Sequence, residues 1–135
     1  MVLKRLPDDF IKLDKLKAMQ PQLLLVFGCV AHFAKMPLHT ELLLRFPDAV
    51  RVGCSTAGEI SAAGVESGTT VVTAVVFDRV QTWAVSTPLL GMQASADAGK
   101  ALAQQLNGRN PKAVLVYGQG VGINWRNVFL QGSKG

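Results

Sequence analysis

Long apolar stretches are absent from this sequence. The most extended ones, such as Leu23 to Phe27, are far too short to span a bilayer. The first ten residues, MVLKRLPDDF, contain neither the apolar segment nor the cleavage site of a signal peptide. We therefore expect a protein that does not associate with a membrane and that resides in the cytoplasm.

Cysteine and histidine are scarce. The chain has 2 cysteines, Cys29 and Cys54, and 2 histidines, His32 and His39, and these residues do not follow the spacing of metal ligands. Two cysteines do not form a disulfide framework, so both are expected to be reduced thiols. The sequence predicts neither a disulfide-stabilised scaffold nor a metal site.

Concentrated charge of one sign is also missing. The chain carries 14 Lys and Arg against 9 Asp and Glu, a net charge of +5, but the basic residues are scattered. Only the segment KLDKLK is locally basic, and its spacing is typical of the solvated face of a helix. We expect no nucleic-acid partner, because this charge favours weak attraction of small anions over a dedicated nucleic-acid surface.

The pattern of the first half predicts a parallel βαβ unit. Hydrophobic residues make up 49% of the 135 residues, enough for a core in one domain. Helical spacing covers residues 7–19, and the segment QLLLVFG that follows is typical of a strand buried on both faces. A second helix begins at Pro37 and ends at the FPDA turn, before the strand VRVGC.

The second half predicts further strands and one more helix. TTVVTAVVF and VQTWAVS, separated by Asp78 and Arg79, favour an antiparallel hairpin. Residues 95–106 are rich in helix formers, with Ser95 as the expected N-cap, and AVLVY predicts one more buried strand. The expected fold is a single α/β layered domain with a mixed, partly parallel β-sheet flanked by helices.

Three loops should follow the parallel strands, where open α/β sheets bind ligands. They are GCVAHF, CSTAGEI and GQGVGIN. The last has the spacing G-x-G-x-G, which does not fit a dinucleotide-binding loop, since no acidic residue ends a strand about 20 residues on. Its glycines instead indicate a close approach of the backbone to a ligand or to a neighbouring loop.

The CSTAGEI loop allows two readings. Cys54 as a nucleophile, with His32 as its base, would make a hydrolase, but no third orienting group is identifiable, which favours an inert thiol. Thr56 and Glu59 have the T-x-x-E spacing of a capping box, so we expect them to cap a following helix. Ser55 and the remaining backbone N–H groups would then be free to hold a carboxylate or phosphate.

The segment RFPDAVRVGCSTAGEI resembles the N-terminal part of the FIST domain, a family of sensory modules. LLLVFG, VESGTTVVTAVVF and VLVYGQGVGIN recur in the order that the family shows, so the resemblance covers most of residues 21–132. It implies a sensory domain that binds a small ligand, an amino acid or related metabolite, and that signals to a histidine kinase or a cyclic-nucleotide enzyme. Some members are described as haem-binding nitric-oxide sensors.

The resemblance also suggests site residues. Its characteristic positions are Gly53 to Glu59, together with Gly120 and Asn124. Where the family usually has an aspartate after the last strand, this chain has Gln119, and Trp125 replaces a common glycine; these departures imply a changed or lost specificity. The expected ligand-binding residues are His32, Cys54, Ser55, Thr56, Gly58, Gln119, Gly120 and Asn124.

The sequence leaves several functions open. We interpret residues 1–135 as one, partial, N-terminal FIST domain without enzymatic turnover and without a cofactor. The alternatives are a haem-based nitric-oxide sensor, a ligand-free scaffold and a Cys54-dependent hydrolase. Haem would need His32, His39 or Cys54 as its axial ligand, yet His39 shares a helical face with Leu43 and Phe46 and is expected to be a packed or rim residue. Exposed sheet edges favour self-association into a homo-oligomer.

Overall fold

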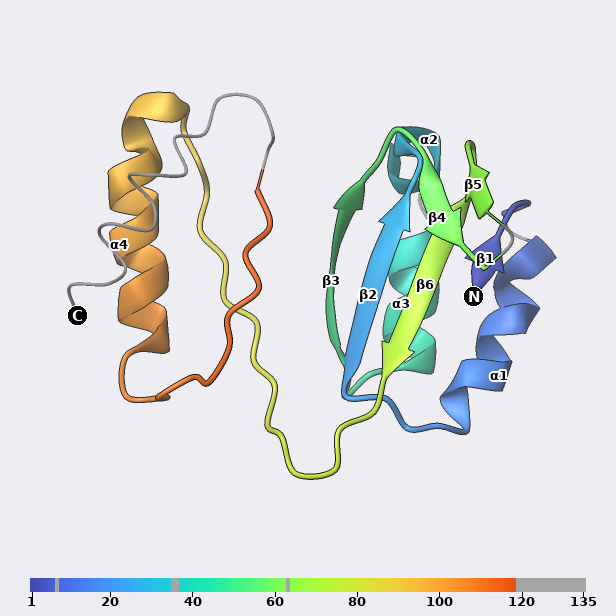
Figure 1. Cartoon of the computed structure of the whole chain (residues 1–135), viewed down its shortest axis with the longest axis horizontal. Coiled ribbons are helices and arrows are strands. Elements are labelled where there is room, and N and C mark those ends of the chain that lie inside the picture. The colour runs from blue at the N-terminus through green and yellow to red at the C-terminus, as the bar shows by residue number, and fades with distance from the viewer. Residues whose placement is uncertain (7, 35–36, 63, 119–135) are drawn as a thin grey trace. The chain divides into compact units, whose positions relative to one another are not determined.

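The chain folds into two compact units, each with its own secondary structure. The computed structural model describes residues 1–6, 8–34, 37–62 and 64–118 (Figure 1). The first unit is Met1–Ala84 and the second is Val85–Gly135. All the strands of the described residues lie in the first unit, whereas the described part of the second unit contains one long helix.

A four-stranded mixed sheet forms the centre of the first unit. Its strands are β1 (Val2–Leu3), β2 (Leu23–Gly28), β3 (Val50–Ser55) and β6 (Thr70–Val75), in the order β1-β6-β2-β3. β2 is parallel to β3 and antiparallel to β6, and β1 is antiparallel to β6. The mixed sheet with its helices confirms the predicted α/β fold class.

The predicted helices of the first half are present. The segment expected to be helical over 7–19 forms η1 (Asp8–Leu13) and α1 (Asp14–Lys17). α3 (Leu38–Arg45) is the predicted second helix and leads through the FPDA turn into β3 (Figure 1). α2 (Val30–Ala34), which follows β2 at its carboxyl end, was not predicted, because GCVAHF was expected to be a loop. The predicted parallel βαβ unit is therefore confirmed.

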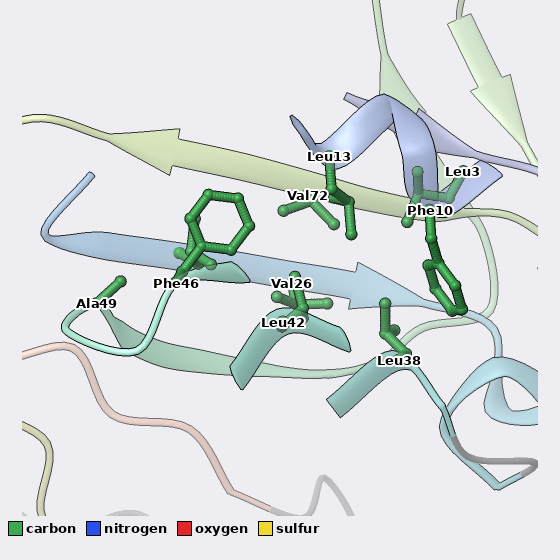
Figure 2. Packing of buried hydrophobic residues seen from close by; sticks show 10 residues of the cluster. Leu3, Phe10, Leu13, Val26, Leu38, Leu42, Phe46, Ala49 and Val72 are labelled. Atoms are coloured by element: carbon green, nitrogen blue, oxygen red, sulfur yellow. The ribbon is translucent and has the colours of Figure 1, made fainter. Parts of the chain in front are cut away.

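The core lies between one face of the sheet and the helices η1 and α3. Alternate residues of a strand point to the same face, so Leu24 and Val26 of β2 and Val72 of β6 contact this helical layer (Figure 2). We call this side of the sheet the helical face and the other side the second face. The buried cluster consists of Leu3, Phe10, Leu13, Leu24, Val26, Leu38, Leu42, Phe46, Ala49 and Val72.

A small ribbon replaces the helix expected after Thr56. β4 (Glu59–Ser61) pairs antiparallel with β5 (Gly64–Glu66), with Ile60 opposite Val65. β-branched residues at these opposing positions favour a strand pair over a helix. The sequence did not predict this ribbon, nor the two-residue β1.

The hairpin predicted between 69–77 and 80–86 is wrong. β6 pairs instead with β1 and β2, and residues 76–90 contain no strand. Hydrogen bonds to Gln22 explain why the chain after β6 does not fold back as a strand. Phe77 N donates to Gln22 Oε1 at 2.7 Å, and the Thr82 hydroxyl donates to Gln22 O at 3.2 Å. These bonds hold the segment at the start of β2 and leave no ladder for a returning strand.

The second unit contains η2 (Met92–Ala94) and α4 (Ser95–Leu106), which matches the predicted helix. Ser95 is not its N-cap: Ala94 holds that position, and the Ser95 hydroxyl donates to Met92 O at 2.7 Å. The strand predicted at AVLVY is also wrong. Residues 113–117 carry no strand, since the described part of this unit offers no second strand to pair with.

Candidate functional site

Three chain segments meet at the carboxyl end of the parallel pair, at the top of Figure 1. Gly28 at the end of β2 is in register with Ser55 of β3 and with Thr70 of β6. Two backbone bonds join the adjoining loops: Cys29 N donates to Thr69 O and Thr56 N donates to Gly28 O, both at 2.9 Å. Side chains from all three loops therefore lie close together, as the βαβ topology predicts.

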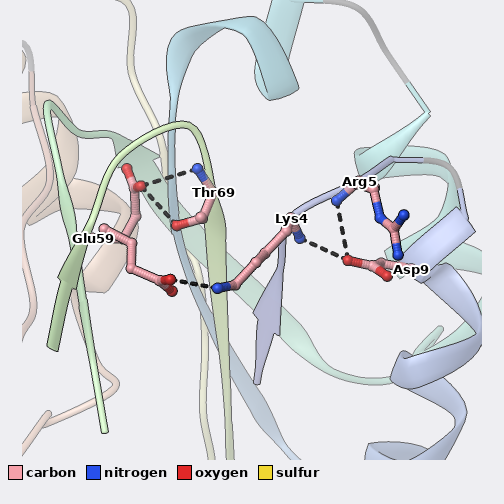
Figure 3. A network of polar contacts seen from close by, with 6 residues as sticks. Lys4, Arg5, Asp9, Glu59 and Thr69 are labelled. Carbon is pink, nitrogen blue, oxygen red and sulfur yellow. Dashed lines mark hydrogen bonds and ion pairs between the residues drawn. The ribbon is translucent and has the colours of Figure 1, made fainter. Parts of the chain in front are cut away.

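A buried carboxylate organises the first cluster. Glu59 is only 3% exposed, and the Thr56 hydroxyl donates to its Oε1 at 2.7 Å. Thr69 donates to Oε2 through its backbone N–H at 3.2 Å and its hydroxyl at 2.9 Å (Figure 3). These bonds, that of Thr56 foremost, hold the pKa of Glu59 below its ordinary value although burial opposes this. Glu59 is thus an ionised carboxylate whose direct partners are neutral.

The capping-box interpretation of Thr56 and Glu59 is corrected by this geometry. The two side chains bond to each other, but Glu59 begins strand β4, so there is no helix N-terminus for them to cap. The carboxylate instead ties the loop after β3 to Thr69, ten residues further along the chain. Spacing alone indicated the Thr56–Glu59 pair but not its second partner.

A histidine forms the second cluster. His32 Nδ1 lies 2.8 Å from Thr70 Oγ1, and Thr70 is fully buried. Gly28 makes room for this threonine, since a Cβ on Gly28 would lie 2.3 Å from Thr70 Oγ1. The charge of His32 also contributes to lowering the pKa of Glu59. The two clusters are therefore electrostatically coupled, and the adjacent residues Thr69 and Thr70 join them.

The sheet register separates Cys54 from the histidine. Cys54 is in register with Phe27 on the second face, whereas Ser55 is in register with Gly28 and shares the helical face with Thr70. Both Cys54 and Ser55 are exposed at the end of β3. The imidazole bonded to Thr70 and the thiol therefore belong to opposite faces of the sheet.

The structure brings together some of the predicted site residues. His32, Cys54, Ser55, Thr56 and Gly58 all lie at this end of the sheet. Gln119, Gly120 and Asn124 lie outside the described residues. Sequence reasoning missed Thr69 and Thr70, which read only as part of a strand because their partners are far away along the chain.

A separate polar cluster joins β1 to η1. Asp9 is 5% exposed, and its Oδ2 accepts hydrogen bonds from the backbone N–H groups of Lys4 and Arg5 at 2.7 and 3.0 Å (Figure 3). The Lys12 ammonium contacts Oδ1 at 2.8 Å and, with those N–H groups, holds the pKa of Asp9 well below its usual range. Lys4 also pairs with Glu66, which links β1 to the ribbon.

Within the described ranges, no group of three or more His, Cys, Asp and Glu residues could hold a metal ion. No described helix is both long and apolar enough to cross a bilayer. His39, expected to be a packed or rim residue, is exposed and not packed, because Leu38 and Leu42 form the buried side of α3.

The fold and the strand-end clusters define an α/β domain with loops gathered at the carboxyl edge of a mixed sheet. The family model described as FIST N domain matches residues 22–132, a range that includes both clusters. The chain therefore belongs to the FIST N domain family, a family of sensory and signal-transduction domains. No curated protein and no solved structure matches the chain.

Proposed function

We propose that this chain is a sensory domain that binds a small ligand, an amino acid or a related metabolite, at the carboxyl end of β2 and β3. One observation carries the proposal: loops far apart in sequence place His32, Thr56, Glu59 and Thr70 in two coupled clusters beside the exposed Ser55. In open α/β sheets such a strand end is where ligands bind.

The electrostatics of the site favour a ligand that carries an ammonium group. Glu59 is buried and ionised, and its direct partners Thr56 and Thr69 are neutral. A buried charge whose direct hydrogen-bond partners are neutral is costly, so a cationic group that approaches it gains more than it would in water.

The proposed signalling role follows from the family. A ligand that prefers one arrangement of the loops shifts their equilibrium, and a partner that recognises this arrangement reads the shift. We propose a histidine kinase or a cyclic-nucleotide enzyme as that partner and the cytoplasm as the location. No enzymatic turnover is assigned to this domain.

A thermal-shift screen tests ligand binding. Amino acids, small amines and small carboxylates are added to the purified chain, and a ligand that binds the native state raises the melting temperature. We expect at least one amino compound to raise it and Ser55→Ala to reduce the shift, because Ser55 is exposed at the site. Thr73→Ala, at an exposed position on the second face of β6, should leave the shift unchanged. If no compound raised the melting temperature, the ligand-free scaffold would be favoured.

The haem alternative makes a different prediction. Haem needs an apolar slot and an axial ligand, and His32 is engaged with Thr70 while His39 stands on the exposed side of a helix. We expect no stoichiometric binding when the protein is titrated with hemin. A sharp Soret band that saturates at one equivalent, and that His32→Ala abolishes, would establish the haem-based sensor instead.

The hydrolase alternative requires an activated Cys54 thiol. The register that sets Cys54 and the Thr70-bound imidazole on opposite faces argues against a Cys–His pair. We expect iodoacetamide to label Cys54 slowly at neutral pH, because no imidazole pairs with its thiol. Rapid labelling near neutrality that is lost in His32→Ala would support the hydrolase.

A further inference from the structure

The outer edge of β3 has no strand partner among the described residues. β3 is the last strand in the order β1-β6-β2-β3, and among the described strands it pairs with β2 alone (Figure 1). Val50 N donates to Gln22 O and Thr56 N donates to Gly28 O, both at 2.9 Å. Bonds to one neighbour come from alternate residues, so Val52 and Cys54 also face β2. Arg51, Gly53 and Ser55 therefore direct their N–H and C=O groups outward.

This edge lacks the devices that usually protect a strand from pairing. Natural edges carry proline, a bulge, an outward charge, or are very short. β3 has six residues in unbroken register with β2 and no proline, whereas β1 at the other edge has only two residues. Its one charged residue is Arg51, and the guanidinium is held inward by bonds to Phe46 O and Ala49 O at 2.6 and 2.8 Å.

We propose that β3 pairs with β3 of a second copy, antiparallel and centred on Gly53, so that two sheets join into one. This register is the one that uses all three outward residues, with Arg51 opposite Ser55 of the other copy and Gly53 opposite Gly53. It brings no like charges together, which favours a second copy as the occupant. The second faces of the two sheets then form one continuous surface, with Val52 of each copy next to Cys54 of the other.

Sedimentation and light scattering of the whole chain test the assembly. We expect a species of twice 14.4 kDa at high protein concentration. The net charge of +5 opposes association, so added salt should strengthen the dimer. A strict monomer at all concentrations would overturn the proposal. So would a monomer whose Gly53 amide is protected from hydrogen exchange, since another segment would then cover the edge.

A charge change at Ser55 tests the register. Ser55 is exposed, so its substitution should spare the fold. Ser55→Lys would set a lysine opposite Arg51 twice in each dimer and should weaken association by about tenfold. Ser55→Glu should not weaken it. Thr73→Lys adds the same charge at an exposed position of the inner strand β6. It should weaken association only slightly, through the net charge, and less so at high salt. Equal effects of Ser55→Lys and Ser55→Glu would contradict the register.

A cysteine crosslink tests the same register by geometry. In the proposed register, position 52 of one copy lies opposite Cys54 of the other in a non-hydrogen-bonded pair. The Cα atoms of such a pair are about 4.5 Å apart, which is within disulfide range. In a Cys29→Ser background, Val52→Cys should crosslink to Cys54 of the other copy on mild oxidation and give a covalent dimer. The same background with Thr73→Cys should remain monomeric on a reducing-agent-free gel. No crosslink at position 52, or an equal one at position 73, would overturn the proposed pairing.

Discussion

Glu59 is the residue on which the loop network depends most. It accepts three hydrogen bonds from Thr56 and Thr69 while 3% exposed. We expect Glu59→Gln to lower the free energy of unfolding at neutral pH by about 1 to 3 kcal/mol, because bonds to a charged acceptor are replaced by weaker ones. Urea unfolding followed by circular dichroism measures the change.

The pH dependence of this effect has a defined sign. The folded pKa of Glu59 is lowered, so its contribution is complete above the unfolded pKa of about 4.3 and is lost as the pH falls toward the folded value. The difference between the wild type and Glu59→Gln should therefore shrink below about pH 4. Glu66→Gln, opposite Glu59 in the ribbon, removes only an ion pair with exposed Lys4 and is the control. Equal losses in both variants would contradict the role of Glu59.

Gly53 is required by the close approach of β2. A Cβ at this position would lie 1.8 Å from the Val26 carbonyl oxygen, and backbone cannot yield as a flexible side chain can. We expect Gly53→Ala to destabilise the fold by about 2 kcal/mol or more, measured by urea unfolding. Gly58→Ala is the matched control, since its Cβ would meet Val65 Cγ1 at 3.6 Å in ordinary contact. Two variants of equal stability would show that β3 can move away from β2.

At the residue scale, spacing predicted contacts within a loop but not across the fold. Thr56 and Glu59 were predicted to bond to backbone N–H groups in a capping box, but their side chains bond to each other instead. Their helix did not form, since Ile60 and Val65 gain more as a cross-strand pair. Thr69 and Thr70 gave no signal of their own, because what distinguishes them is a partner 10 or 38 positions away.

At the element scale, α2 depends on a single side-chain anchor. The helix has no buried residue, and His32 is bonded to Thr70 of β6. Thr70→Val preserves the volume beside Gly28 but removes the hydroxyl. We expect the α2 amides to exchange about fivefold faster, which corresponds to the loss of about 1 kcal/mol, while the β2 amides stay protected.

Hydrogen exchange, followed by mass spectrometry or NMR, measures how much the His32–Thr70 bond protects the α2 amides. Thr73→Val, on an exposed position of the same strand, controls for a change in strand propensity. Exchange in α2 that is equally fast in the wild type and in Thr70→Val would show that the His32 bond does not hold the helix. Faster exchange in both variants would assign the effect to β6 itself.

The strands show what local patterns can and cannot predict. β2 and β3 were predicted correctly, because each is a run of apolar or β-branched residues within a βαβ unit whose topology supplies the partner. VQTWAVS and AVLVY have similar composition, yet neither forms a strand in the described residues. Propensity is therefore insufficient, and the pairing of β6 with the two-residue β1 depends on contacts some 70 positions apart.

At the scale of the whole molecule, the family match and the core differ in extent. The FIST N domain match covers residues 22–132 and so continues from the first unit into the second. The buried cluster, in contrast, comes entirely from residues between Leu3 and Val72. The composition correctly predicted a chain able to form a core and an α/β fold, but it contained no signal of where that core would be concentrated.

This concentration of the core predicts that the two units differ in independent stability. The first unit buries Leu3, Leu13, Leu24 and Val72 completely, whereas the buried residues of α4 are the small Ser95, Ala98 and Gly99. We expect a fragment of residues 1–84 to fold with a cooperative urea transition. A fragment of residues 85–135 should show little helix by circular dichroism, because an isolated 12-residue helix is marginal in water. If residues 1–84 lacked a cooperative transition, the core of the first unit would be insufficient to stabilise the sheet that carries the site.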